Sequence, residues 1–401
     1  MSEITDFGLA ALVVGAFLTL AVFSNKLSDR FPIPAPAIFL LVAALVGSLS
    51  TTVGDKLSIR DVERVAVVAL VAILFDGGMR VGWRRFRLAA MPISLLGTLG
   101  TFATAGVIAL AGRYLFDFSW TGAGMLGAAL APTDPAVMFS VLGKREVGGR
   151  TGTILEGESG VNDPVGIALM IGMIELATHA DASFWIVVRE FAVEMSIGLA
   201  IGIAGALVLL ASVRRIQLLD PALYPLRSVA AAGLIYGVAA VAHGSGFLAV
   251  FVAGIVIGDA DYPNRREVIR FHKSLASLAE VIVFVVLGLT INTVSLSSVW
   301  ADAIFLSLIL VFVARPFAVA PFLAAARLRR GERLFVMWSG LKGAVPILLA
   351  AFALLKGVGQ ADRIYGIVFV VVLFSVVFQG VTIPYVARRL GVPMRLAEHG
   401  S

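Results

Sequence analysis

Two apolar stretches of the chain carry carboxylates whose types and spacing suit cation or proton chemistry. Residues 155–164 read LEGESGVNDP, so three carboxylates, a hydroxyl and an amide stand at the start of an apolar run that continues to about residue 176. Farther upstream, residues 131–135 of another apolar run read APTDP. A charged side chain at the centre of a bilayer costs roughly 2.5–3.5 kcal/mol on insertion scales. We therefore interpret these acids as functional, most simply as ligands of a cation or a proton.

The composition predicts an all-α polytopic membrane protein. Of the 401 residues, 59% are hydrophobic and 14% are charged. The apolar stretches repeatedly reach about 17–25 residues, which is long enough to cross roughly 30 Å of hydrocarbon as a helix. Soluble α/β proteins have shorter apolar strands that alternate with amphipathic helices. We expect about thirteen transmembrane helices, at about 7–25, 34–50, 62–79, 88–111, 119–142, 152–178, 184–211, 224–243, 246–258, 270–290, 299–325, 333–356 and 364–387.

Several site chemistries are excluded or disfavoured by the residue types. The chain has no cysteine, which excludes disulfides, thiolate metal sites and cysteine nucleophiles. The four histidines show no metal-ligand spacing. The first apolar run is preceded by acidic rather than basic residues, so we expect a retained span instead of a cleaved signal peptide. We expect no cofactor and no enzymatic activity.

The basic residues predict the orientation in the membrane. The formal net charge is +6, and Lys and Arg concentrate in alternate loops, such as 80–87, 144–150 and 265–273. The positive-inside rule then places the N-terminus outside and the C-terminus in the cytoplasm, which agrees with an odd number of spans. We expect a multi-pass protein of the cell (plasma or inner) membrane with a short cytoplasmic tail at 388–401. The basic charge is explained in this way without nucleic acid as a partner.

Two predicted spans are interrupted by helix breakers at matching places. The fifth contains the APTDP segment, and the twelfth contains GLKGAVP at 340–346. Each is followed by one further span, so spans 5 and 6 correspond to spans 12 and 13. This pattern is typical of secondary transporters with inverted repeats and broken helices. We divide a single domain, 1–395, into a first repeat at about 7–178, a linking helix at about 184–211 and a second repeat at about 224–387.

The first interruption is predicted to lack helical geometry. Pro132 and Pro135 remove backbone donors and disfavour helix at Ala131 and Asp134, so residues 131–134 should be extended. Bare backbone at membrane depth is tolerated only where it lines a cavity or meets polar groups. Asp134 and the carbonyl or hydroxyl of Thr133 would supply such a lining. The alternative is a simple proline kink with Asp134 reaching toward the interface.

Helical spacing divides the acids of the sixth span by role. Ser159 and Asp163 are four residues apart and share an oxygen-rich face, which suits a hard monovalent cation. Glu158 is five residues from Asp163 and points about 140° away from it. A buried Arg cannot neutralise itself by losing its proton, so Arg315 must find a carboxylate or carbonyls. We predict a structural Glu158–Arg315 ion pair.

Other charges have two interpretations. Lys342, in the second interruption, compensates the ends of the broken half-helices or pairs with Asp134. Asp76 either attracts cations into a funnel or is an ordinary interfacial charge. We expect Glu156 to be closer to water than Glu158. The acids near predicted span ends are interpreted as interfacial, namely Glu175, Glu194, Asp259 and Glu280.

Taken together, these motifs resemble the NhaP/NHE cation–proton antiporters of the cation:proton antiporter-1 family. The resemblance rests on 131–135, on ESGVNDP at 158–164, on Arg315-Pro316 and on 340–346, and it extends over nearly the whole chain. It implies an NhaA-like antiporter fold with crossed, interrupted helices. It also implies a homodimer with a mobile core that carries spans 5, 6, 12 and 13.

The resemblance also implies residue roles. Asp163 would take either the cation or the proton, with Ser159, Thr133, Asp134 and Asn162 as further residues of the cation- and proton-binding site. Asn162 stands where electrogenic relatives have a second Asp, which implies electroneutral one-for-one exchange. The remaining positions are the Glu158–Arg315 pair, Asp76 as an accessory acid, and Lys342 in place of the arginine that is common at this motif.

We therefore expect a secondary active antiporter. It would exchange a monovalent cation, Na⁺ first and K⁺ or Li⁺ as alternatives, for H⁺ by competition at Asp163 with alternating access, as in pH homeostasis. A Na⁺-coupled symporter of a small organic anion is the alternative, and it would need a second polar pocket. An intramembrane aspartyl protease that uses Asp134 and Asp163, which lie on adjacent spans, would need a Gly-x-Gly-Asp element, and neither aspartate has it. A passive channel would conduct without proton countermovement.

Overall fold

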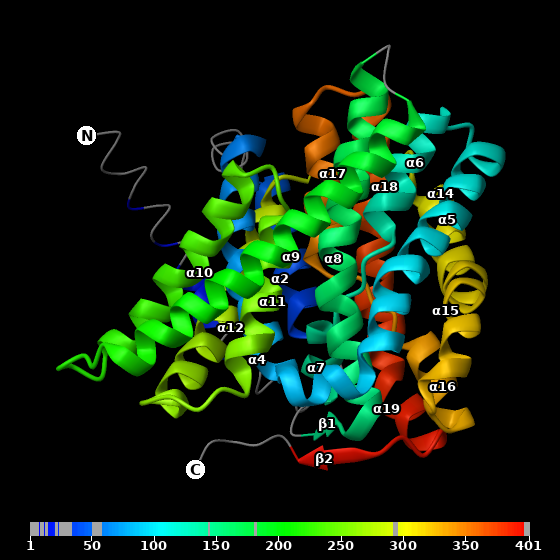
Figure 1. Ribbon diagram of the computed structural model, residues 1–401. Helices are drawn as coiled ribbons and strands as arrows, with labels where there is room; N and C mark the ends of the chain where they lie inside the picture. Colours follow the sequence, from blue (N-terminus) through cyan, green and yellow to red (C-terminus); the bar gives the residue numbers. More distant parts are fainter. Residues whose placement is uncertain are drawn as a thin grey trace.

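A computed structural model describes residues 34–49, 58–142, 145–179, 183–291 and 296–396, with a few positions between 8 and 23. The predicted first span at about 7–25 and the last residues of the predicted tail lie largely or wholly outside this part. Within it, eight helices are long and apolar enough to cross a membrane. Shorter apolar helices occupy Ala35–Ser48, Gly246–Gly258 and Ala344–Leu355. The protein is mostly helical, as predicted (Figure 1).

The first part of the chain, up to the linking helix, forms the following elements in order. They are α2 (Ala35–Leu49), α4 (Ile59–Leu95), the π-helix η1 (Leu96–Gly100), α5 (Thr101–Leu115), α6 (Trp120–Leu130), α7 (Pro135–Leu142), β1 (Arg145–Val147), α8 (Gly149–Thr178) and α9 (Phe184–Arg215).

The second part repeats the pattern of long and interrupted helices. Its elements are α10 (Leu223–Val241), α11 (Gly246–Gly258), α12 (Arg265–Leu289), α14 (Trp300–Ile309), the π-helix η2 (Leu310–Ala314), α15 (Arg315–Leu323), the 3₁₀ turn η3 (Ala324–Ala326), α16 (Arg330–Trp338), α17 (Ala344–Leu355), α18 (Ala361–Phe374), the π-helix η4 (Ser375–Gln379), α19 (Gly380–Arg389) and β2 (Met394–Leu396).

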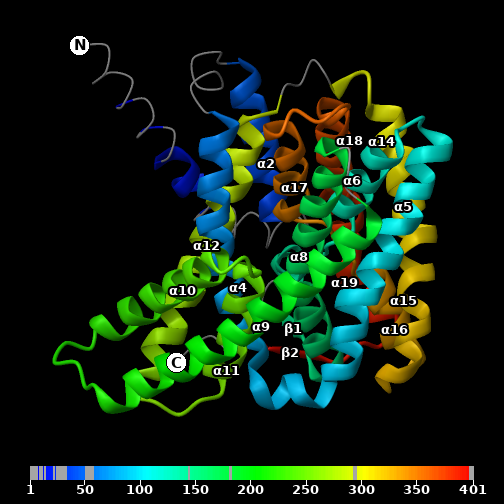
Figure 2. The same ribbon diagram turned by 45° about the horizontal axis from the view of Figure 1, so that its top comes forward.

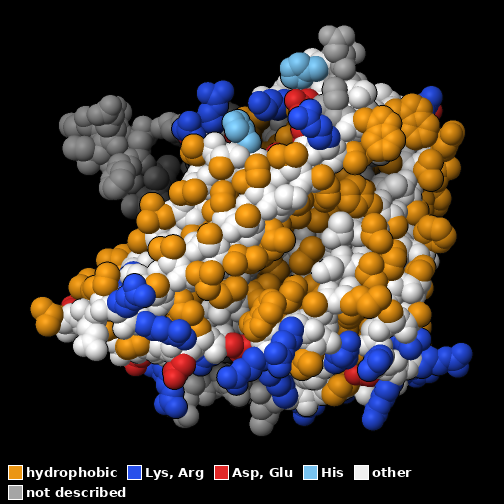
Figure 3. All heavy atoms as spheres, viewed as in Figure 1, with side chains coloured by type: hydrophobic (Ala, Val, Ile, Leu, Met, Phe, Trp, Pro, Cys, Tyr) orange, Lys and Arg blue, Asp and Glu red, His pale blue; other side chains and the backbone are white. Residues whose placement is uncertain are grey.

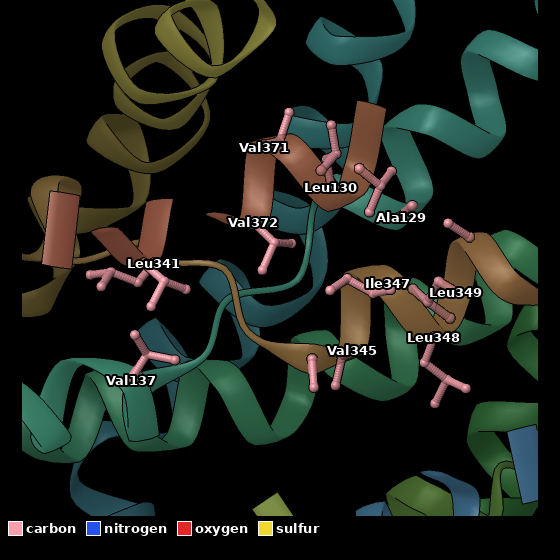
Figure 4. Close-up of a cluster of buried hydrophobic side chains, with 14 of the residues drawn as sticks. Ala129, Leu130, Val137, Leu341, Val345, Ile347, Leu348, Leu349, Val371 and Val372 are labelled. Carbon is pink, nitrogen blue, oxygen red and sulfur yellow. The ribbon is translucent and has the colours of Figure 1, made fainter. Parts of the chain in front are cut away.

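The two interrupted spans cross each other, as the fold class predicts. The backbone N–H of Asp134, between α6 and α7, donates to the carbonyl oxygen of Leu341, between α16 and α17, at 2.8 Å. Figure 4 shows the two extended connections passing each other, with apolar side chains such as Leu130, Val137 and Val345 around them. These side chains are buried. The first break is shorter than predicted: Ala131 keeps helical angles, and the break begins at Pro132.

Two of the three π-helices among the described residues also occupy matching places. η1 joins α4 to α5 in the fourth predicted span, and η2 joins α14 to α15 in the eleventh, seven spans later. A π-turn inserts one residue into a helix and often marks a functional position. In η2 this turn stands directly before Arg315. The paired positions agree with an architecture of two related halves.

The prediction of a loop at residues 80–87 is wrong. α4 continues through this stretch to Leu95, with one non-helical position at Gly82 (φ 63°, ψ 155°). A positive φ favours glycine, and a side chain here would also meet the carboxylate of Asp259. That carboxylate accepts a hydrogen bond from the N–H of Arg84 at 2.6 Å. After this kink the helix runs along the lower edge of the molecule in Figure 2, so the basic residues there lie on a helix.

The end of the described chain is not a free tail. β2 pairs antiparallel with β1, with Val147 opposite Met394. Arg395 forms an ion pair with Glu146 at 3.0 Å. This two-stranded sheet, which the sequence analysis did not predict, attaches the segment after α19 to the start of α8. Figure 3 shows hydrophobic side chains over the middle of the visible face and Lys and Arg gathered along the edge where the sheet lies.

Candidate ion-binding site

A cavity of about 100 Å³ is lined by residues of α4, α7, α8, α11, α12 and α17. Two of its lining residues, Ser159 and Asp163, come from α8 and share one helix face, as their spacing predicts. Both are 6% exposed. Within the described part of the chain, neither side chain makes a hydrogen bond or an ion pair. A buried carboxylate and hydroxyl that face a cavity without protein partners are available to a cation or a proton.

Asp134, in the extended connection, also lines the cavity. Its Oδ1 accepts a hydrogen bond from the N–H of Ala136 at 2.8 Å, at the N-terminus of α7. A carboxylate at this end of a helix is favoured by the helix dipole. The connection at Gly343 packs so closely on this carboxylate that a side chain there would overlap it. Asp134 therefore contributes both to the crossing and to the cavity wall.

Thr133 and Asn162 are bound to each other rather than to the cavity. The side-chain amide of Asn162 donates to Oγ1 of Thr133 at 2.8 Å, and its carbonyl oxygen accepts from the N–H of Thr133 at 3.4 Å. Both residues are buried, and neither lines the cavity. In this conformation Asn162 positions the broken segment on α8. The sequence analysis expected both residues among the ion ligands.

Glu158 and Arg315 are in contact, as the sequence predicts. The two guanidinium nitrogens Nη1 and Nη2 donate to Oε1 and Oε2 at 2.5 and 3.0 Å. The two side chains are 1% and 6% exposed, and neither lines the cavity. Gly340 gives the arginine room, because a Cβ there would lie 2.6 Å from Nε. This bidentate, buried geometry suits a structural clamp between α8 and the second interrupted span.

Lys342 binds the end of the half-helix α6 and not Asp134, the other partner that the sequence analysis considered. Its Nζ donates to the carbonyl oxygens of Ala131 and Pro132 at 3.0 and 2.8 Å. These carbonyls lie at the C-terminal end of α6, where the dipole favours a cation. Lys342 is 1% exposed and makes no ion pair with Asp134. The positively charged Lys342 thus compensates the C-terminal end of α6, and the negatively charged Asp134 compensates the N-terminal end of α7.

Asp76 is neither exposed nor unpaired. Its Oδ2 accepts from Nε and Nη2 of Arg80 at 2.6 and 2.5 Å. The side chain of Asp76 is 2% exposed, whereas that of Arg80 is 39% exposed. Both line the cavity, so Arg80 marks where it approaches the surface. The interpretation of Asp76 as an ordinary interfacial charge is wrong.

A further correction concerns Glu280, which was interpreted as interfacial. It lies on α12, lines the cavity together with Asp134 and Asp163, and has a buried Oε1 without a hydrogen-bond partner. Glu156 also lines the cavity and is more exposed than Glu158, as expected.

Comparison with known proteins identifies the family. The model of the transmembrane part of sodium/hydrogen exchangers matches residues 13–389. The chain belongs to the sodium/hydrogen exchanger family. Among curated relatives, the K⁺/H⁺ antiporter NhaP of Alkalimonas amylolytica is 35% identical over 96% of this chain and 68% of its own length. The K⁺/H⁺ antiporter NhaP2 of Shewanella sp. strain ANA-3 is 31% identical over 94% of this chain and 66% of its own length. The chain thus spans about two thirds of these relatives.

Two further matches extend the comparison. The Na⁺/H⁺ antiporter NhaH of Halobacillus dabanensis is 30% identical over 83% of this chain and 85% of its own length. The solved structure of the sodium proton antiporter MjNhaP1 from Methanocaldococcus jannaschii has a TM-score of 0.81 at 21% identity and covers 95% of this chain and all of that one. This likeness shows that the exchanger has an antiporter fold, in agreement with the predicted fold class.

Sequence reasoning missed two residues that hold the second break of this exchanger in place. Oγ of Ser375 accepts from the N–H of Lys342 at 3.0 Å and donates to Oε1 of Gln379 at 3.0 Å. Nε2 of Gln379 donates in turn to the carbonyl oxygen of Trp338, the last residue of α16, at 2.5 Å. Both polar residues lie in η4, four positions apart inside an apolar span. That spacing was the available signal.

Proposed function

We propose that this exchanger transports a monovalent cation and a proton in opposite directions by competition for Asp163. The observation that carries the proposal is the pair of unpartnered side chains, Asp163 and Ser159, at a buried cavity. When ionised, the carboxylate binds the cation with the hydroxyl as a second oxygen ligand. When protonated, it is neutral and has no need of a metal ion. Because one group accepts either ligand, cation and proton cannot cross together.

We propose one-for-one, electroneutral exchange. The support is that Asn162, next to Asp163, is a neutral amide committed to Thr133. The cavity therefore lacks a second titrating aspartate on this turn of α8. Moving one cation in one direction and one proton in the other transfers no net charge.

The transported ion is proposed as Na⁺ or K⁺. The names of the relatives support both, since NhaP and NhaP2 are named K⁺/H⁺ antiporters and NhaH is named a Na⁺/H⁺ antiporter. An organic anion finds no support as a cosubstrate. The small cavity is lined by five acidic side chains, whose charge would repel it: Asp76, Asp134, Glu156, Asp163 and Glu280.

The function is tested in proteoliposomes with a pH-sensitive dye. Addition of Na⁺, Li⁺, K⁺ or Rb⁺ should drive proton movement for the transported ions, at a rate that does not change with an imposed membrane voltage. Asp163→Asn should abolish this signal, and Asp61→Asn, an exposed aspartate at the start of α4, should not. Cation-driven proton flux retained in Asp163→Asn would contradict the proposal.

We also propose that the edge carrying β1 and β2 faces the cytoplasm of a cell-membrane homodimer. Support comes from the basic residues along that edge (Figure 3) and from the family. The chain lacks cysteine, so single cysteines report sidedness cleanly. Arg389→Cys, at the end of α19, should resist a membrane-impermeant maleimide in intact cells. Lys356→Cys, after α17, should react. Cross-linking in native membranes would test the dimer.

A further inference from the structure

Glu280 is the cavity residue that the proposed exchange cycle does not use. It lies well inside α12, fifteen residues after the helix begins at Arg265. It lines the same cavity as Asp163, and its Oε1 is buried without a hydrogen-bond partner. Burying a carboxylate without a partner is costly, because water that would solvate it is removed. Glu280 as a whole is only partly buried, and a cation at its carboxylate would replace the solvation that Oε1 lacks.

The other acids of the cavity already have partners or neighbours of opposite charge. Asp76 is bound by Arg80, and Asp134 accepts from the N–H of Ala136. Glu156 lies between this cavity and a neighbouring one of about 350 Å³ that is lined by Arg85, Arg150 and Arg395. Among the described residues, three acids of the cavity receive no hydrogen bond: Glu156, Asp163 and Glu280. Of these, Glu280 has a fully buried oxygen, Oε1, that lacks a partner.

The two carboxylates come from different parts of the fold. Asp163 is on α8, which packs against α4 and α6, whereas Glu280 is on α12, which packs against α2 and α4. The same wall carries the Asp76–Arg80 pair, where the cavity approaches the surface. Ser277, one turn before Glu280, adds a hydroxyl to the lining. One cavity is therefore lined by oxygen ligands from α12 and by Asp163, and the partly exposed Arg80 lies at its wall.

We propose that Glu280 forms a second binding position for the monovalent cation, a staging site between the mouth at Arg80 and Asp163. The inference rests on the proposed antiport function. The site takes a dehydrating monovalent cation through its carboxylate, with Ser277 as a neighbouring oxygen ligand. Asp163 remains the group that exchanges cation for proton. Loss of Glu280 therefore weakens cation capture without removing the exchange chemistry.

The test compares Glu280→Gln with Glu267→Gln in the proteoliposome assay. Glu267 is an exposed residue in the first turn of the same helix, so its variant removes an equal charge outside the cavity. Glu280→Gln should raise the KM for the cation about 3- to 10-fold and leave the maximal rate within about twofold, as expected for the loss of one attractive carboxylate. Glu280→Asp should restore most of the affinity. An unchanged KM in Glu280→Gln would overturn the proposal.

A general effect of negative charge is separated from ligation by ionic strength. Choline chloride screens attraction between distant charges but has little effect on a buried contact. The KM ratio between Glu280→Gln and the wild type should persist at high choline. If high choline lowered the KM ratio of Glu280→Gln to the ratio measured for Glu267→Gln, then Glu280 would only attract cations over a distance. That result would contradict a binding position at Glu280.

Two further readouts keep the outcome decisive. If Glu280→Gln exchanges too slowly for a KM, cation-dependent protection against thermal unfolding in detergent reports affinity directly. If Glu280→Gln were protected at the same cation concentrations as the wild type, the staging site would be refuted. If the variant needed higher cation concentrations for the same protection, the staging site would be supported. Failure of the antiport function is recognised separately, because then the wild type itself would show no cation-driven proton flux.

Discussion

The N–H of Asp134 donates to the carbonyl oxygen of Leu341 at 2.8 Å, and this bond joins the two broken helices at their crossing. On either side of it, one charge compensates each half-helix end. Asp134 accepts from the start of α7, and Lys342 donates to the end of α6. Because backbone groups in a membrane must be satisfied within the protein, these contacts allow two helices to be interrupted at the same depth.

Lys342→Met should destabilise the protein. The carbonyl oxygens of Ala131 and Pro132 would lose their buried donor, which costs about 1–3 kcal/mol. The measurement is the thermal unfolding midpoint in detergent. Lys356→Met, an exposed lysine after α17, provides the control. Equal midpoints for the two variants would show that Lys342 does not stabilise the break.

Glu158→Gln should also destabilise the fold, and more strongly. Removing one partner of a buried ion pair leaves Arg315 without charge compensation, at a cost of about 3–5 kcal/mol. The partly exposed pair of Glu146 and Arg395 is the matched comparison, and Glu146→Gln should cost less than about 1 kcal/mol. The idea of a structural clamp fails if Glu158→Gln unfolds at the wild-type temperature.

Thr133 and Asn162 should show energetic coupling. In a double-mutant cycle of Thr133→Val and Asn162→Ala, the side-chain hydrogen bond should appear as a coupling energy of about 0.5–1.5 kcal/mol. Unfolding in detergent supplies the four stabilities. Additive effects of the two substitutions would indicate that the 2.8 Å contact contributes nothing to stability.

Ser159→Ala should raise the cation KM and retain exchange, because the hydroxyl is one oxygen ligand among several while Asp163 carries the charge. Thr153→Ala is the matched control on the same helix, since its hydroxyl donates to the carbonyl oxygen of Gly149 and does not line the cavity. Proteoliposome kinetics measure both variants. A KM equal to that of the wild type would remove Ser159 from the site.

Lower pH should raise the apparent KM for the cation. Protons occupy the carboxylate that the cation needs, so more cation is required for the same rate. Initial rates measured over a series of pH values, at saturating and at low cation concentration, separate this effect from loss of active protein. If low pH depressed the rate equally at both concentrations, simple competition would be wrong.

Much of the fold follows from local signals in the sequence. Apolar length predicts spans such as α9 and α8, and prolines mark the break at Pro132. The Asp76–Arg80 pair was equally local, since the two residues are four apart on one helix, but it was not recognised. The stretch 80–87 was misassigned because a run of arginines is compatible both with a loop and with a helix along the membrane surface.

By itself the sequence determined the spans, the interrupted helices, the shared face of Ser159 and Asp163, and the need of Arg315 for an acid. These depend on chain stiffness, helical period and the cost of burying charge, all of which act over a few residues. Only the tertiary structure decided that Lys342 binds the end of α6, that Asn162 holds Thr133, and that Glu280 lies in the cavity. Those contacts join segments more than twenty-five residues apart, and such pairings are set by how whole helices pack, which a residue's sequence neighbours do not encode.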